Sequence, residues 1–163
     1  MKDIYMPRPN DEKSLIIIKP DAVQRNLIGE IITRFEKKGL KIIGLKMMSI
    51  HDALIEEHYA HIKDKPFFPG TRDFMTVCPV VVMALSGINA VSAIRLIVGP
   101  TKAWEANAGT IRGDFSLSTQ SNIVHASDSV ETGEIEVKRF FKEEELFSYA
   151  KIDTDFVYAE HKE

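Results

Sequence analysis

The sequence predicts a small α+β or α/β sandwich, with four strands in one sheet and helices covering one face of it. Two observations predict this class. Four short apolar runs alternate with segments whose apolar residues recur at helical spacing. The chain has 163 residues, which fits one domain with a sizeable core, and it shows no internal repeat. We therefore expect one domain over residues 14–163, preceded by an extended or mobile arm over residues 1–13.

Each predicted strand is a short apolar run bounded by residues that break it. The β-branched run Leu15–Ile18 is typical of a strand buried on both faces, and the proline two residues later cannot continue it. Leu40–Ile50, with Gly44 as the site of a bulge, predicts the second strand. Val80–Leu85 predicts the third, and residues 122–125 predict a shorter fourth strand.

The predicted helices follow from apolar residues spaced three and four apart. The first contains Ile28 and Phe35 and ends at Gly39, which we expect in a left-handed conformation. Residues 99–121 lack periodicity and predict a long functional loop. The charged tail 142–163 carries aromatic residues, so we expect it to pack on the body of the chain or on a neighbouring subunit. Three further helices are expected: one from Asp52 to a break at Lys65–Gly70, one from Asn89 to Gly99, and one capped by Ser127 or Asp128.

The composition excludes several classes of protein. With 21 basic and 24 acidic residues, the net charge is −3, whereas proteins that bind nucleic acid over a broad surface are usually basic. Cys78 is the only cysteine, which rules out an intramolecular disulfide and a multi-cysteine zinc site. The N-terminus carries no apolar signal sequence, and the longest apolar run, 77–85, is too short to span a bilayer. We therefore expect no membrane association and a reducing, cytoplasmic location.

Common nucleotide and hydrolase motifs are missing from the sequence. Neither GxxxxGK[ST] nor GxGxxG occurs, which argues against enzymes of the P-loop and Rossmann types. The nucleophile elbow GxSxG is also absent. The charge balance still allows a local basic pocket for a small anion.

Histidines are the first candidates for chemistry. His58 and His61 lie one helical turn apart, which allows a metal site, but their order does not match HExxH and we favour a solvated or half-buried helix face. His125 ends an apolar strand directly before a helix N-terminus, where free N–H groups stabilise a phosphate and the dipole favours a neutral, nucleophilic imidazole. Glu136, on that helix, is placed to orient the ring. The pattern alone leaves open that His125 only fills the end of a strand.

Arginines and aromatic residues provide the next candidates. Arg95 interrupts an apolar helical pattern, and Arg112 has glycines nearby that let a ligand approach the backbone. A guanidinium suits phosphate oxygens, although each arginine taken alone fits a surface ion pair better. Phe67 lies on a helix-breaking segment, where its ring either stacks on a base or tucks into the core. Tyr59 lies on an apolar helical face, where core packing is the simpler expectation.

Several sequence blocks in the same order resemble the nucleoside diphosphate kinase family. The most specific is residues 122–131, Asn-Ile-Val-His-Ala-Ser-Asp-Ser-Val-Glu, which is similar to the family's N-x-x-H-G-S-D-S active-site signature. The resemblance runs from about residue 15 to residue 149. Further matching blocks are Lys19-Pro20-Asp21, His58-Tyr59, Lys65–Phe68 and Gly109–Phe115.

The resemblance implies a ping-pong phosphotransferase in which His125 carries the phosphoryl group from a nucleoside triphosphate to a nucleoside diphosphate. It implies that Ser127 and Glu136 orient His125, that Tyr59 holds Lys19 and the transferring group, and that Asp128 lies near a phosphate-bridging Mg²⁺. The implied nucleotide contacts are Lys19 to the γ-phosphate and ribose, Phe67 to the base, Arg95, Thr101 and Arg112 to the β- and γ-phosphates, and Asn122 to the ribose.

The resemblance also implies a ferredoxin-like βαββαβ sandwich with a four-stranded antiparallel sheet. It implies a homo-oligomer, with a hexamer favoured over a tetramer or dimer. Three features depart from the family pattern. Ala126 replaces glycine, Thr101-Lys102-Ala103 replaces Thr-Asn-Pro in a segment that contributes to subunit contacts, and the arm 1–13 is longer than in many members. Whether Ala126 narrows the pocket depends on its backbone angle.

Two other functions stay open at this point. A catalytically silent nucleotide-binding or regulatory module would keep the fold, and Ala126 and the altered loop motivate it. A single-stranded nucleic-acid binder would use the sheet surface, but the RNP1 pattern is absent and the net charge is negative. Because the residue set around His125 is complete, we expect an active nucleoside diphosphate kinase.

Overall fold

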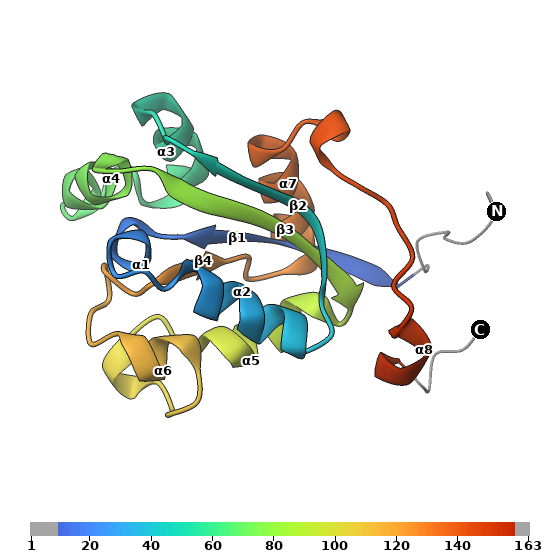
Figure 1. The fold of residues 1–163 in the computed structure, drawn as a ribbon. Coiled ribbons are helices and arrows are strands. Elements are labelled where there is room, and N and C mark those ends of the chain that lie inside the picture. Colours follow the sequence, from blue (N-terminus) through green and yellow to red (C-terminus); the bar gives the residue numbers. More distant parts are fainter. Residues whose placement is uncertain (1–9, 159–163) are drawn as a thin grey trace.

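The four strands form one antiparallel sheet in the spatial order β2-β3-β1-β4, as Figure 1 shows. β1 lies inside the sheet, where it pairs with β3 along its whole length and with β4 through the pair Ile17 and His125. This structure is a computed structural model, and it describes residues 10–158. The strands are β1 Asp11–Ile18, β2 Lys41–Met48, β3 Val80–Ile88 and β4 Val124–Ala126.

The order of the main elements is β1-α2-β2-β3-α5-β4, which confirms the expected βαββαβ sandwich. Two helices, α3 and α4, are inserted between β2 and β3, and α7 follows β4. The longer helices are α2 Ile28–Lys37, α3 Asp52–His58, α4 Phe68–Thr76, α5 Ala90–Val98 and α7 Val130–Phe140. The short ones are α1 Pro20–Gln24, α6 Ile111–Phe115 and α8 Thr154–Val157, with 3-10 turns at Ala60–Ile62, Ala103–Glu105 and Glu143–Glu145.

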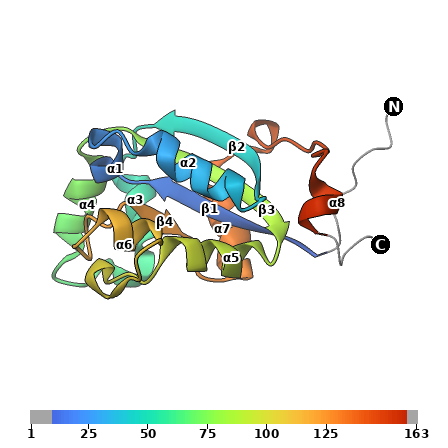
Figure 2. The ribbon, with the colours of Figure 1, turned by 60° about the horizontal axis from the view of Figure 1, so that its bottom comes forward.

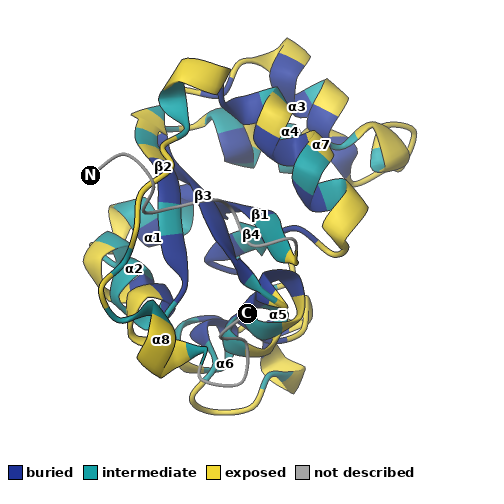
Figure 3. Cartoon of the chain, turned by 90° about the vertical axis from the view of Figure 1, so that its right-hand side faces the viewer, coloured by how far each residue is buried: buried dark blue, intermediate teal, exposed yellow. Residues whose placement is uncertain are grey.

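Helices cover both faces of the sheet, so the expectation of one covered face is wrong (Figure 2). Side chains alternate along a strand, so Ile16 and Ile18 of β1 face α2 and α5, whereas Leu15 and Ile17 face α3, α4 and α7. All four side chains are fully buried. Figure 3 shows the consequence, with buried strands between helices that are buried on one side and exposed on the other.

Two local predictions about glycines are confirmed. Gly39 follows α2 and adopts φ of +95°, the left-handed conformation expected where that helix ends. The pairing of β2 with β3 shifts its register between Ile42 and Gly44, which is the expected irregularity. Asn89 precedes α5 as predicted, but its side chain does not cap the helix; the Glu12 carboxylate accepts the Val91 N–H instead, at 2.9 Å.

Other boundaries differ from the predictions. β1 begins at Asp11, inside the expected arm, and the arm's residues 1–9 lie outside the described residues. The segment 65–70 does not stay irregular, because Phe68 turns into the core and begins α4. The segment 99–121 contains a 3-10 turn and α6. The cap of α7 is neither Ser127 nor Asp128, because the Ser129 hydroxyl accepts the Thr132 N–H at 3.1 Å.

The described part of the C-terminal tail packs on the chain's own body. It runs along the outer edge of β2, where the Phe147 N–H donates to the Ile43 carbonyl and the Tyr149 hydroxyl donates to the Ile42 carbonyl, both at 2.7 Å. These bonds satisfy edge carbonyls that a sheet otherwise leaves open. Among residues 10–158, no helix is both long enough and apolar enough to cross a membrane.

Candidate active site

A cavity of about 870 Å³ lies between β4, the α3–α4 segment and α7. Side chains from distant parts of the sequence meet there, because β4 pairs with β1 at one edge of the sheet and residues of the α3–α4 segment and of α7 line the same cavity. Of the residues predicted to form the site, only Ser127 does not line the cavity. The predicted residues that line it are Lys19, Tyr59, Phe67, Arg95, Thr101, Arg112, Asn122, His125, Asp128 and Glu136.

His125 is held from behind by Glu136, a buried carboxylate on α7. Its Nε2 lies 3.0 Å from Glu136 Oε2, and the Ser127 hydroxyl donates to the same oxygen at 2.6 Å. The Ser127 hydroxyl in turn accepts the Leu15 N–H of β1 at 3.0 Å. Burial alone raises the pKa of Glu136, but the hydrogen bonds from His125 and Ser127 outweigh it and hold that pKa below its ordinary value.

This arrangement selects one tautomer of His125. An ionised carboxylate only accepts hydrogen bonds, so the proton of the neutral ring lies on Nε2. The lone pair then lies on Nδ1. Because the side chain is 18% exposed and lines the cavity, a neutral imidazole nucleophile can meet a bound ligand there.

Close packing of α7 on β1 brings Glu136 to this position. Gly133 lies one turn before Glu136, and a Cβ at Gly133 would overlap the carbonyl oxygen of Lys13. Only glycine lets the helix approach the strand this closely.

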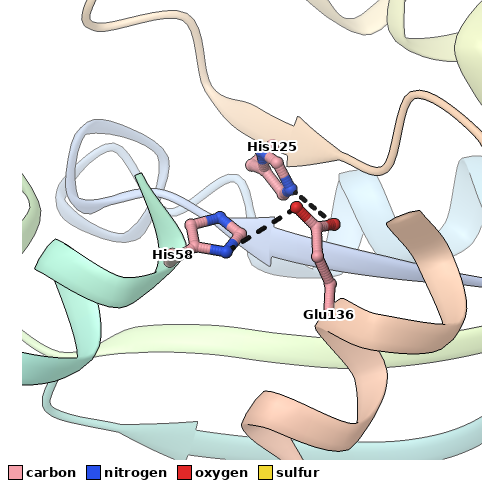
Figure 4. A group of neighbouring side chains, drawn as sticks. All are labelled: His58, His125 and Glu136. Carbon is pink, nitrogen blue, oxygen red and sulfur yellow. Dashed lines mark hydrogen bonds and ion pairs between the residues drawn. The ribbon is translucent and has the colours of Figure 1, made fainter. Parts of the chain in front are cut away.

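His58 also belongs to the cluster, although the sequence favoured a solvated or half-buried helix face for it. Its side chain is fully buried, its Nδ1 lies 3.6 Å from Glu136 Oε1, and its ring packs edge-on against the His125 ring with centroids 4.6 Å apart. Figure 4 shows His58 of α3 and His125 of β4 next to each other, each joined by a dashed line to the Glu136 carboxylate of α7. Burial, followed by the repulsion of His125, lowers the pKa of His58 to about 3, so this ring is neutral at pH 7.

Arg112 is buried, so a surface ion pair is not its role. Its guanidinium donates to the carbonyls of Gly99, Asn122 and Val124, at 3.0, 3.3 and 2.7 Å. Burial, followed by the charge of Arg95, lowers the pKa of Arg112 to about 10. No carboxylate among the described residues forms an ion pair with Arg95 or Arg112, so this wall of the cavity keeps uncompensated positive charge.

Lys19 brings a third positive charge to the same wall. Its ammonium donates to Asn122 Oδ1 at 2.6 Å and to the Gln120 carbonyl at 3.3 Å. The Asn122 amide in turn donates to the Thr101 carbonyl at 3.0 Å, so this contact fixes the start of the altered loop. Burial, followed by the repulsion of Arg112, lowers the pKa of Lys19 to about 8.

Aromatic residues line the opposite side of the cavity. Phe67 is 58% exposed, whereas its neighbour Phe68 is 5% exposed and belongs to the core. The ring of Tyr59 lies 6.3 Å from that of His125, and burial raises the pKa of its hydroxyl. Phe67 is thus free to contact a planar ligand, and the ring of Tyr59 lies beside that of His125.

Ala126 fits the site without backbone strain. It lies in β4 opposite Ile16, and it is not among the described residues with a positive φ. The unusual backbone lies three residues earlier, at Ile123, whose φ is +73°. Its N–H donates to a carboxylate oxygen of Asp21 at 3.0 Å. No local pattern predicts a left-handed conformation at this β-branched residue, although Asp21 belongs to a block that resembles the family.

The comparisons with known proteins agree with this geometry. The family profile described as nucleoside diphosphate kinase matches residues 12–146. A nucleoside diphosphate kinase of Parabacteroides distasonis is 57% identical over 138 residues, which is 85% of this chain and 90% of the relative. One from Methanothermobacter thermautotrophicus is 50% identical over 149 residues, covering 91% of this chain and 99% of the relative.

A solved structure leads to the same family. The halophilic nucleoside diphosphate kinase of Halobacterium salinarum, solved in complex with CDP, matches with a TM-score of 0.89 and 43% identity. The match covers 91% of this chain and 99% of that one. By profile, by sequence identity and by fold, the chain belongs to the nucleoside diphosphate kinase family of enzymes.

Proposed function

We propose that the chain moves the γ-phosphoryl group of a nucleoside triphosphate to a nucleoside diphosphate through a phosphorylated His125. One observation carries the proposal. His125 Nε2 is held 3.0 Å from Glu136, at a cavity whose other wall carries Lys19, Arg95 and Arg112. A nucleophile with its lone pair toward a cluster of cations suits phosphoryl transfer.

The same atom of His125, Nδ1, accepts the phosphoryl group in the first half-reaction and releases it in the second. In the first, Nδ1 forms a bond to the γ-phosphorus while the bond from that phosphorus to the β–γ bridging oxygen breaks, and the nucleoside diphosphate leaves with the electron pair. In the second, a terminal oxygen of another nucleoside diphosphate forms a bond to that phosphorus, while the N–P bond breaks and its electron pair returns to Nδ1. Glu136 stabilises positive charge on the ring in both half-reactions, because its carboxylate accepts a hydrogen bond from the proton that stays on Nε2.

The cationic wall supports the phosphate contacts. Arg95 and Arg112 have no competing carboxylate among the described residues, and the Lys19 ammonium is anchored by Asn122 beside them. These groups offset the charge of the β- and γ-phosphates and hold the phosphorus in line with Nδ1.

The remaining contacts fit a nucleoside of any base. Phe67 offers an exposed ring for stacking, which does not read the hydrogen-bonding edge of a base. Asn122, Thr101 and Lys19 reach parts common to all nucleotides, the sugar and the phosphates. We therefore infer broad use of nucleoside tri- and diphosphates.

Mg²⁺ fits the cavity as an ion held mainly by phosphates and water. Proteins bind this cation through one or two carboxylates together with substrate phosphates. Asp128 lines the cavity and is exposed, whereas Glu136 is already bonded to His125 and Ser127. Asp128 would therefore face the ion, which neutralises phosphate charge when it is bound.

We also infer that the chain assembles with copies of itself, with a hexamer favoured. Large apolar side chains stay exposed on two segments, namely Leu45 and Met47 on β2 and Trp104 and Leu117 on the 99–121 segment. Contiguous exposed apolar side chains mark an interaction surface, and Leu45 and Met47 lie two residues apart on the same face of β2. Sedimentation analysis of the full chain tests this assembly, and a monomer at micromolar concentration would contradict it.

The experiment on the mechanism incubates the full chain with γ-labelled ATP and Mg²⁺ but without an acceptor. We expect label on the protein that survives base, is lost in acid, and moves to added GDP. The variant His125→Asn should take no label while its circular dichroism stays that of the wild type. A wild type that binds nucleotide but never takes label would exclude the phosphohistidine route and leave the silent module.

A further inference from the structure

The His58 side chain is left without a function by the mechanism above. It is fully buried, and neither ring nitrogen has a hydrogen-bond partner among the described residues. Buried polar atoms are nearly always paired, and an exception calls for an explanation such as an ion or a catalytic role. His58 Nδ1 faces the Glu136 carboxylate, and the His58 ring lies against the ring of His125 (Figure 4).

The geometry points to a binding site for a divalent transition-metal ion of the Zn²⁺ type between His58, His125 and Glu136. Each residue offers one ligand atom, and the three atoms lie within 4.8 Å of one another. The two histidines face different oxygens of the carboxylate, with His58 Nδ1 3.6 Å from Glu136 Oε1 and His125 Nε2 3.0 Å from Glu136 Oε2. Side-chain shifts of about 1 Å would let one zinc ion lie roughly 2.0–2.2 Å from a nitrogen or oxygen atom of each residue.

The donor set selects against the magnesium ion of the reaction. Two imidazoles and one carboxylate are ligands that zinc uses in proteins, whereas magnesium demands oxygen and keeps its water. All three residues also line the cavity, so an ion can enter from it and the fourth position stays open to water or phosphate. The site is therefore distinct in chemistry from the Asp128 side of the cavity.

Occupation of this site would stop phosphoryl transfer, a consequence that rests on the proposed function. A metal ion takes the lone pair of a neutral imidazole, so coordination through Nε2 moves the ring proton to Nδ1. That proton blocks the atom that attacks phosphorus, and the carboxylate no longer holds the tautomer that frees it. Zinc would thus inhibit by changing the tautomer of His125, and raising the ATP concentration would not restore activity.

The direct test is a cobalt titration of the full chain, free of nucleotide and magnesium. Co²⁺ takes the place of zinc and gives an intense visible absorption when its coordination is tetrahedral. We expect one equivalent to saturate this signal and Zn²⁺ to displace it. His58→Gln should weaken binding at least about ten-fold, the lower end of what loss of a supporting group costs a metal site. His61→Gln is the matched control, because His61 is exposed and lies outside the cluster.

A second variant and a second assay complete the test. Glu136→Gln keeps the shape of the side chain and should also weaken the cobalt signal, which covers the case that His58→Gln unfolds. Label transfer from ATP, measured with and without buffered free zinc, should be inhibited in the wild type and in His61→Gln and insensitive to zinc in His58→Gln. The site is refuted if cobalt gives no tetrahedral signal, or if His61→Gln weakens it as much as His58→Gln. A wild type that takes no label without zinc would refute the proposed function, and the cobalt result would still decide the site.

Discussion

Removing the Ser127 hydroxyl should cost both stability and phosphorylation rate. In Ser127→Ala, Glu136 loses a 2.6 Å hydrogen bond and the buried Leu15 N–H loses its 3.0 Å acceptor. A hydrogen bond to a charged group contributes about 1.5–3 kcal/mol, and an unpaired buried donor costs about 1–3 kcal/mol. We expect the free energy of unfolding to fall by about 3 kcal/mol. The labelling of His125 should slow roughly ten-fold, the effect of about 1.4 kcal/mol on a barrier.

The loss of stability should depend on pH. The pKa of Glu136 lies below its ordinary value in the folded chain, so this carboxylate adds stability above its unfolded pKa and loses it as the pH falls through the folded value. Without the Ser127 hydroxyl the folded pKa rises toward the unfolded one, and that contribution shrinks. The difference between variant and wild type should therefore be larger at pH 7 than at about pH 3.

Urea unfolding at both pH values measures this difference, and Ser129→Ala is the control. Ser129 caps α7 two residues away and is exposed, so loss of its hydroxyl should lower the free energy of unfolding by only about 1 kcal/mol. This loss should be the same at both pH values, because Ser129 does not bond to Glu136. Equal losses for the two variants, or a Ser127→Ala loss that does not change with pH, would refute the reasoning.

Three further predictions concern other contacts of the site. Gly133→Ala should lower the free energy of unfolding by about 1–3 kcal/mol, because the added Cβ has no room beside β1. Gly29→Ala lies in open space within α2 and should raise that free energy by about 0.5–1 kcal/mol; thermal unfolding measures both changes. Phe68→Ala should cost about 3–5 kcal/mol in urea unfolding, while Phe67→Ala should leave stability nearly unchanged and weaken nucleotide binding; the opposite assignment would exclude Phe67 as the stacking ring. The pKa of Lys19 is about 8, so its positive charge is present below that pH and lost above it. The affinity for ADP, measured by calorimetry, should therefore fall between about pH 7 and pH 9.5 in the wild type but not in Lys19→Met.

The sequence predicted those parts of the fold that local patterns determine. The four apolar residues of β1 and the spacing of α2 each gave the right element, because burial leaves a period in the sequence. The start of α4 was missed, since helix-breaking residues at 65–70 hide a helix that tertiary packing of Phe68 stabilises.

The site divides in the same way. Of the ten predicted residues that line the cavity, seven lie in blocks that resemble the family, whereas Arg95, Thr101 and Glu136 lie outside those blocks; the roles of all ten stay predictions. The burial of His58 and Arg112 could not be predicted. The local sequence around each favours a surface position, and the segments that cover the two side chains lie elsewhere in the chain. The left-handed Ile123 also has no local signal, since the Asp21 carboxylate that bonds to it lies far away in the sequence.

The position of β1 in the sheet determines when the catalytic centre can form during synthesis. β1 is translated before both of its neighbours in the sheet, which are residues 80–88 and 124–126, and its Leu15 N–H donates to a residue that follows later still, Ser127. Such long-range pairs make folding slow relative to a chain of local contacts. The apolar half of β1 therefore has no strand partner until residues 80–88 have been translated, and the hydrogen bond that supports Ser127 cannot form until residue 127 has been added.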